Sequence, residues 1–214
     1  MKMKTKRKAL LLSLCAVLLV VASVMGTMAY LTSTDTVTNT FSVGKVEIEL
    51  DEAKVDKYGT EVPNADRVKT NEYLLVPGQE YTKDPTVHVK PVSEDSYIFV
   101  KVDNAIAKLE AETETAANGY KKIADQITGN GWTQLLDAND QPVANVYYRI
   151  YDAPQTTPTA DTNYLVFGNF KLKDNADKET GVWGAANTKI TVTAYAIQKA
   201  GFDTPAAAWA EVSK

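Results

Sequence analysis

Short stretches of alternating apolar and polar residues run along most of the chain after residue 44, and this pattern constrains the fold more than any other feature. Val46, Ile48 and Leu50 alternate with charged residues, and a similar period of two recurs in later segments. A period of two is typical of strands that bury one face and expose the other. We predict strands over residues 45–50, 81–90, 97–102, 132–136, 143–151, 164–170 and 189–198.

Two stretches depart from this alternation and indicate helices. Residues 104–117 are rich in Ala, Glu and Lys, and apolar residues recur at helical spacing over 120–127, so we predict one or two short helices in an insertion at about 103–128. Thr204 followed by Pro205 is typical of an N-cap and a first helical turn, which predicts a short C-terminal helix. Together these elements predict a mainly β fold, an antiparallel β-sandwich with a short helical insertion and a short C-terminal helix.

Three further features concern the connections between the predicted strands. Pro85 lies within the 81–90 segment and cannot donate a hydrogen bond, so we expect an edge or a bulge there. Residues 51–71 form a polar insertion of about 20 residues, a length that often indicates a functional or mobile loop. Residues 174–179 carry clustered oxygen ligands that calcium prefers, but their spacing differs from an EF-hand loop, and we interpret them as a solvated loop.

The first 29 residues have the layout of a secretory signal peptide. Five basic residues within the first eight precede an uncharged apolar run over residues 9–25. The small residues Thr27 and Ala29 stand where a signal peptidase requires them, so we expect cleavage before Tyr30. Signal peptidase is therefore a predicted partner during export, and the remainder of the chain is expected to be secreted.

Two other interpretations apply to this N-terminal region. An uncut apolar run of about 20 residues is long enough to remain as a membrane anchor. Cys15 offers a site for lipidation, but the residue before a lipidated cysteine is normally small and Leu14 is not. We interpret Cys15 as a small apolar residue of the signal peptide.

The composition of the remaining chain excludes several classes of protein. Of 214 residues, 185 follow residue 29, which is enough for one domain; we divide them into a segment over 30–43 and a sandwich domain over 44–214. They carry 18 basic and 27 acidic residues, a formal charge of −9, which argues against nucleic acid as a partner. They contain no cysteine, which excludes disulfides and thiol catalysis and is typical of secreted proteins of Gram-positive bacteria.

Residues that could support catalysis are scarce. His88 is the single histidine, lies between two valines of a predicted strand, and is expected to face solvent or to be hydrogen-bonded. The sequence contains neither H-E-x-x-H nor G-x-S-x-G. We therefore predict no catalytic residues, no metal site and no cofactor, and we predict that the protein is not an enzyme.

Aromatic side chains permit a second kind of function, a carbohydrate-binding platform. Aromatic residues in sandwich strands more often belong to the core, so we keep this as the alternative. The residues concerned are Trp132, Tyr147, Tyr148, Tyr151 and Trp183.

Several motifs resemble the TasA/camelysin family of secreted proteins. They are Gly26–Ala29, Tyr30–Asp35, Asn39–Leu50, the L-x-P-G turn within Leu75–Tyr81, and more weakly Ile190–Gln198. The resemblance implies a jelly-roll-like sandwich, processing by a SipW-type signal peptidase, and assembly into fibres of a biofilm matrix. For such a fibre, an accessory matrix or cell-wall protein is a further candidate partner. Camelysins are associated with metallopeptidase activity, but this chain has no residues onto which a zinc site could be transferred.

The segment that follows the expected cleavage site has the pattern of an exposed strand. Thr residues occupy alternate positions from 32 to 40, and Leu31, Val37 and Phe41 fall on the opposite face. The resemblance implies that this segment adds as a strand to the next copy of the protein, head to tail. The alternative is that it is the first strand of its own sheet.

Three functional hypotheses follow from the sequence. The first is a secreted structural subunit of an extracellular biofilm-matrix or cell-surface fibre, a homopolymer that assembles by N-terminal strand addition. The second is a monomeric cell-surface module that binds a glycan or a protein. The third, with the least support, is a camelysin-like metallopeptidase.

Overall fold

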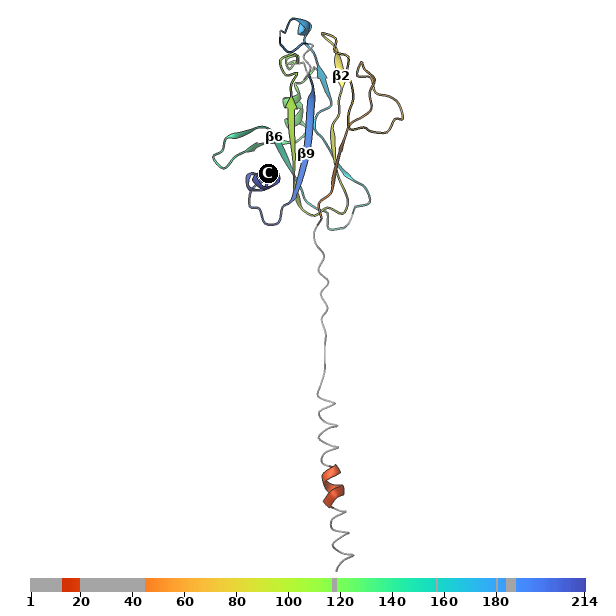
Figure 1. Cartoon of the computed structure of the whole chain (residues 1–214), viewed down its shortest axis with the longest axis vertical. Coiled ribbons are helices and arrows are strands. Elements are labelled where there is room, and N and C mark those ends of the chain that lie inside the picture. The colour runs from red at the N-terminus through yellow and green to blue at the C-terminus, as the bar shows by residue number, and fades with distance from the viewer. Residues whose placement is uncertain (1–12, 20–44, 117–118, 157, 180, 184–187) are drawn as a thin grey trace, which may run out of the picture. The chain divides into compact units, whose positions relative to one another are not determined.

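The computed structural model describes residues 13–19, 45–116, 119–156, 158–179, 181–183 and 188–214 (Figure 1). Residues 13–19 are helical, and the described residues from 45 onward belong to one compact unit. No helix within these described ranges is long and apolar enough to span a membrane.

The unit from residue 45 is mainly β, and all of its strand pairs are antiparallel. The described strands form a three-stranded sheet in the order β1-β3-β7, a two-stranded sheet β2-β8, and a four-stranded sheet in the order β5-β6-β4-β9. Their bounds are β1 Ile48–Asp51, β2 Glu80–Thr82, β3 Thr86–Val89, β4 Ser96–Asn104, β5 Thr133–Leu136, β6 Pro142–Tyr151, β7 Thr162–Leu165, β8 Asn169–Lys171 and β9 Ile190–Gln198.

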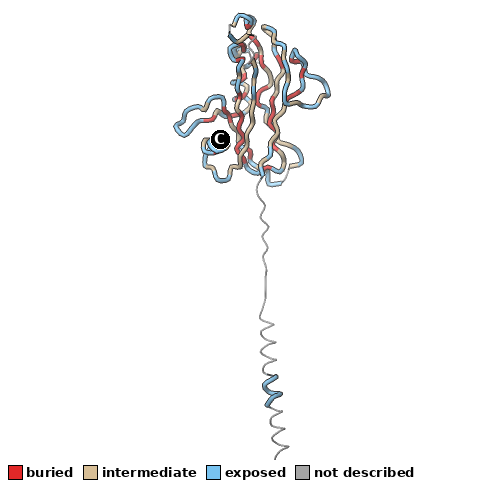
Figure 2. Tube along the Cα trace, in the orientation of Figure 1, coloured by how far each residue is buried: buried red, intermediate tan, exposed pale blue. Residues whose placement is uncertain are grey.

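The main core combines side chains from the inner faces of these sheets. Ile98 and Val100 of β4 belong to the same buried cluster as Val87 and Val89 of β3 and Phe170 of β8. Buried positions follow the strands, whereas the connecting loops are largely exposed (Figure 2). The predicted antiparallel β-sandwich is thereby confirmed, while its jelly-roll connectivity stays a prediction.

A smaller cluster covers the outer face of the four-stranded sheet. Tyr97 and Phe99 alternate with the inward residues of β4 and therefore point to the opposite face. There they pack beneath α3 (Pro205–Val212), whose first turn is capped by the Thr204 hydroxyl, which accepts a hydrogen bond from Ala207 N at 3.2 Å. The predicted C-terminal helix and its cap are confirmed.

The helical insertion is shorter than predicted. Residues 104–116, the described part of that stretch, do not form a helix, since β4 continues to Asn104 and turns follow, and α2 is confined to Ile123–Gly129. The buried Glu110 carboxylate explains the difference, because it accepts hydrogen bonds from the Tyr120 hydroxyl at 2.6 Å and from Ile123 N at 2.7 Å. These tertiary contacts override the helical propensity of the Ala, Glu and Lys residues.

Two predicted strands are each divided between two sheets. The 81–90 segment becomes β2 and β3, and the 164–170 segment becomes β7 and β8. The two breaks lie beside each other, because Lys83 N donates a hydrogen bond to Gly168 O at 3.1 Å. Pro85 lies at the first break and has no N–H for a ladder, which agrees with the irregularity predicted there.

The polar insertion over 51–71 is ordered by bridges within it and by contacts with the sandwich. Bridges pair Glu52 with Val68 and Val55 with Glu61. Gly59 has a φ of 80°, and a Cβ there would lie 2.8 Å from Tyr81 Cα, so glycine is required where the insertion crosses β2.

Candidate functional site

β1 and β9 are outer strands of different sheets, and among the described strands neither has a partner on its outer side. Between them lies a groove of about 870 Å³. We call it the acceptor groove. Its walls are formed by residues 47–52, 69–71 and 189–194 together with Lys83, Pro85 and Lys90.

The acceptor groove combines apolar side chains with an unpaired main-chain edge. Ile48 and Leu50 of β1 and Ile190, Val192 and Ala194 of β9 are half-buried and pack against the main core. β9 contains neither a charged residue nor a proline over its nine residues. An extended peptide can hydrogen-bond to such an edge while its alternate side chains occupy the apolar floor.

The two walls of the acceptor groove run in opposite directions. Glu94 N donates to Lys45 O at 3.0 Å, and Lys199 N donates to the adjacent Asp95 O at 2.7 Å, so the start of β1 lies near the end of β9. At the other end, Asn71 and Lys189 line the same space. We call the Lys45 end the exit end, because the described part of this unit begins there.

The opposite end of the acceptor groove opens into a second cavity of about 790 Å³, which we call the end pocket. The two share Asn71, Lys83, Lys189 and Ile190. Three aromatic side chains line the end pocket: Tyr73, Phe170 and Trp183. The Tyr73 and Phe170 rings meet edge to face with centroids 5.4 Å apart, and burial raises the pKa of the Tyr73 hydroxyl.

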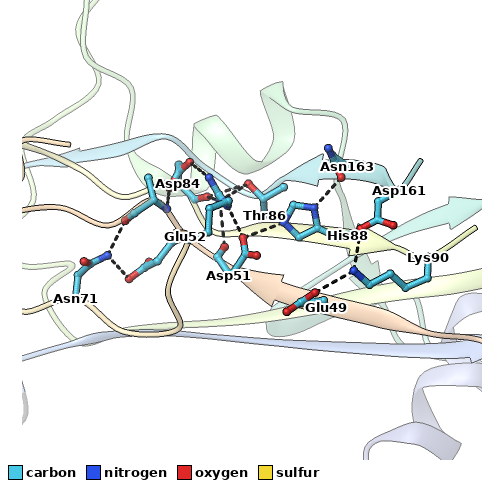
Figure 3. A network of polar contacts seen from close by, with 12 residues as sticks. Glu49, Asp51, Glu52, Asn71, Asp84, Thr86, His88, Lys90, Asp161 and Asn163 are labelled. Carbon is cyan, nitrogen blue, oxygen red and sulfur yellow. Dashed lines mark hydrogen bonds and ion pairs between the residues drawn. The ribbon is translucent and has the colours of Figure 1, made fainter. Parts of the chain in front are cut away.

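A polar network on the outer face of the three-stranded sheet fixes β1 in place (Figure 3). His88 of β3 lies between Asp51 of β1, with Nε2 2.9 Å from Oδ1, and Asn163 of β7, with Nδ1 2.7 Å from Oδ1. Arg67 donates to Asp51 Oδ1 at 2.5 Å and to Asp84 Oδ2 at 2.8 Å. The network therefore joins all three strands to the 51–71 insertion.

These contacts affect the titration of the groups involved. Burial disfavours the charged form of Asp51, but hydrogen bonds from Arg67 and His88 outweigh it and lower the pKa of this carboxyl below its ordinary value. Hydrogen bonds to Asp161 and Glu49, at 2.8 and 2.9 Å, raise the pKa of the Lys90 ammonium. Both groups are thereby held in their charged forms.

The sequence-based expectation for His88 is confirmed, because it is a hydrogen-bonded strand residue. Within the described residues, no group of three or more His, Cys, Asp or Glu side chains is arranged to hold a metal ion. In the 174–179 loop, a short 3-10 helix covers Ala176–Lys178, with Ala176 buried.

The aromatic residues proposed for a carbohydrate platform do not form one. Trp132, Tyr147 and Tyr151 are buried in the main core, and Tyr148 packs on the opposite face of the sheet. Trp183 lines the end pocket, whereas Tyr148 lines a separate small cavity between β5 and α3, so the two share no surface. Alternation along β6 sends adjacent tyrosines to opposite faces, which prevents a common surface.

The residues predicted for processing and strand addition lie outside the described residues. They are Thr27, Ala29, Tyr30, Leu31, Val37 and Phe41. Sequence reasoning missed the acceptor groove itself. The absence of charge and proline in β9 was a usable signal, but nothing in the local pattern indicated that β1 would face it.

Comparisons of the chain with protein-family models, with curated proteins and with solved structures found no match.

Proposed function

We propose that the protein is a secreted structural subunit of an extracellular biofilm-matrix or cell-surface fibre. In this proposal the N-terminal segment of one copy adds as a strand in the acceptor groove of another. The observation that carries the proposal is β9, a nine-residue edge strand without charge or proline beside a groove that has an apolar floor and charged walls. Soluble proteins normally blunt such an edge.

The N-terminal segment matches the acceptor groove in length and pattern. At about 3.4 Å per residue, residues 31–41 extend over roughly 34 Å and β9 over roughly 27 Å. The face with Leu31, Val37 and Phe41 would cover the groove residues, and the threonine face would meet solvent. Asp35 falls on the groove-facing side as well, where the groove is also lined by Lys69, Lys83 and Lys90. Main-chain hydrogen bonds to β9 would supply affinity, since they do not depend on side-chain identity.

Export would determine when assembly can begin. Cleavage before Tyr30 would free the segment only after translocation, so pairing would begin outside the cell. The segment could also occupy the groove of its own chain before it exchanges with a neighbour. In both cases, within its own chain and in a neighbour, the segment would occupy the acceptor groove.

Electron microscopy of the purified chain starting at Tyr30 tests the proposal. We expect filaments whose amount rises with protein concentration, and no filaments when residues 30–41 are deleted. Val37→Pro and Phe41→Asp should also abolish filaments, because proline removes a ladder donor and aspartate places a charge in the apolar groove. Thr40→Asp is the matched control on the solvent face. Wild-type polymerisation of all these variants would contradict strand addition.

The end pocket supports a second candidate, a monomeric cell-surface module. Its aromatic lining and its polar rim of Asn71, Lys83 and Lys189 suit a glycan or a peptide side chain. A chain that stays monomeric at high concentration while Trp183→Ala abolishes binding to a glycan array would favour this candidate.

A further inference from the structure

The acceptor groove has two distinct ends, and this asymmetry bears on what kind of assembly forms. We infer that the polarity of the N-terminal segment in the groove decides between an open filament and a closed dimer, and that the filament places Phe41 in the end pocket. This inference rests on the proposed function and deepens it.

Chain connectivity fixes where the C-terminal end of the segment lies. Lys45 lies at the exit end, bonded through its carbonyl to Glu94 N. The end pocket lies at the other end, beside the start of β9 at Ile190. A segment that binds its own groove must therefore turn back beside β1 and run antiparallel to it, which brings Leu31 towards the end pocket.

The same polarity in a second copy leads to closure. If the segment of one copy enters the groove of a neighbour at the neighbour's exit end, the exit ends of the two copies come together. The neighbour's own segment starts from that same place. Each segment can then occupy the other's groove, and this reciprocal exchange satisfies both grooves in a two-fold dimer. No groove remains free for a third copy.

The opposite polarity gives an open chain of subunits. A segment whose C-terminal end lies at the end pocket runs parallel to β1 and antiparallel to β9. Phe41 then lies at the end pocket and Leu31 at the exit end. Antiparallel pairing is the more stable of the two ladders, which favours this arrangement on the long edge of β9. The accepting copy keeps its exit end free, so addition continues head to tail.

The chemistry of the end pocket suits a phenyl ring. Tyr73 and Phe170 already meet edge to face, and Trp183 lies on the same wall. Aromatic rings prefer such edge contacts, and phenylalanine has no polar atom that would need a partner. Val37 would lie four residues along β9, over the apolar floor near Ala194.

Exposed apolar residues stand at the two ends that a filament would bring together. Only four residues, 42–45, follow Phe41 up to the exit end, a span of at most about 14 Å. Adjacent units would therefore lie within about 14 Å of each other at these ends. Val92 at the exit end is 54% exposed, and Leu74 and Val76 beside the end pocket are 50% and 38% exposed.

Site-specific crosslinking tests the polarity. The chain from Tyr30 onward has no cysteine, because Cys15 is the only one in the sequence. Lys189→Cys places an exposed thiol at the end pocket. One double variant combines it with Thr40→Cys and the other with Thr32→Cys. In an extended strand, residues 32 and 40 lie roughly 27 Å apart. Filaments treated with a short bis-maleimide are analysed on a denaturing gel.

We expect the T40C/K189C filaments to give a ladder of covalent oligomers and the T32C/K189C filaments to give none. A ladder from T32C/K189C alone would overturn the inferred polarity and leave strand addition standing. Filaments linked by neither pair would show that the segment does not occupy the groove, which overturns the proposed function and the inference together. A parent chain that forms no filaments overturns both as well.

Discussion

The two edges of the four-stranded sheet differ in almost every respect that controls pairing. β5 has four residues, a register shift between Gln134 and Leu136, and a following turn that begins at Asp137. β9 at the other edge has nine residues in continuous register with β4. The β5 edge is short and irregular, and the β9 edge is long and regular.

The two edges of this sheet therefore differ in how readily they can pair with another chain. A short strand with a bulge and a charged turn discourages pairing with another chain, whereas a long strand without charge or proline invites it. The open groove beside β9 has no counterpart of similar lining at β5, where the small cavity is bounded by the turn and by α3. We therefore regard β9 as the edge retained for strand addition.

The largest expected effect is on assembly. Ala194→Glu places a carboxylate on the floor of the acceptor groove, where an added strand would bury it. Burying an unpaired charge costs several kcal/mol, so we expect filament formation to be lost. Electron microscopy and sedimentation of polymer measure the loss.

Thr133→Glu is the matched control, since it introduces the same charge at the exposed start of β5. It should leave filaments intact, and circular dichroism should show both variants folded. Equal loss of filaments in both variants would remove the distinction between the two edges.

The next largest effect concerns stability on the α3 side of the sheet. Trp209 packs on Phe99 and Tyr195, with ring centroids 5.3 and 5.2 Å away. Trp209→Ala should lower the free energy of unfolding by about 3 kcal/mol, because it removes this half-buried contact area. Urea denaturation measures the change, and filaments should still form where the variant is folded. Loss of filaments from a fully folded W209A chain would show that α3 takes part in assembly.

A smaller effect is expected for the wall of the acceptor groove opposite β9. Asp51→Asn weakens the hydrogen bonds from Arg67 and His88 and should cost about 2 kcal/mol at neutral pH. The pKa of Asp51 is lowered from 3.8, so its stabilising contribution is complete above that pH and is lost as the pH falls through the folded-state value. The difference in unfolding free energy between the two chains should therefore shrink below about pH 4.

Denaturation of both chains at several pH values measures this difference. Asp56→Asn, a change at an exposed turn in the same insertion, is the control for a general charge effect. A difference that stays constant down to pH 2 would contradict the assignment to Asp51.

The smallest effect is expected at the cap of α3. Thr204→Ala removes the acceptor for Ala207 N and should lower stability by about 1 kcal/mol. Thr204→Ser keeps the hydroxyl and should restore most of the loss in thermal unfolding. A T204S chain as unstable as T204A would indicate that the methyl group, rather than the cap, matters.

The local sequence pattern was sufficient to predict strands with regular alternation and a helix with a clear N-cap. Residues 97–102 were predicted as a strand and lie within β4, and residues 189–198 correspond to β9. Thr204 and Pro205 begin a helix as predicted. These predictions succeed because alternation and caps depend on neighbours a few residues away.

Tertiary structure alone decided how these elements meet. The helix predicted over the described residues 104–116 is absent, because hydrogen bonds to the buried Glu110 override the helical propensity there, and one predicted strand is divided at Pro85 between two sheets. The pairing of Leu31, Val37 and Phe41 with a groove stays a prediction from sequence, because those residues lie outside the described ranges. The groove itself arises where β1 and β9, more than 130 residues apart, end two different sheets side by side. Periodicity along a chain records which face of a strand is buried, but contains no information on which distant edge it will face.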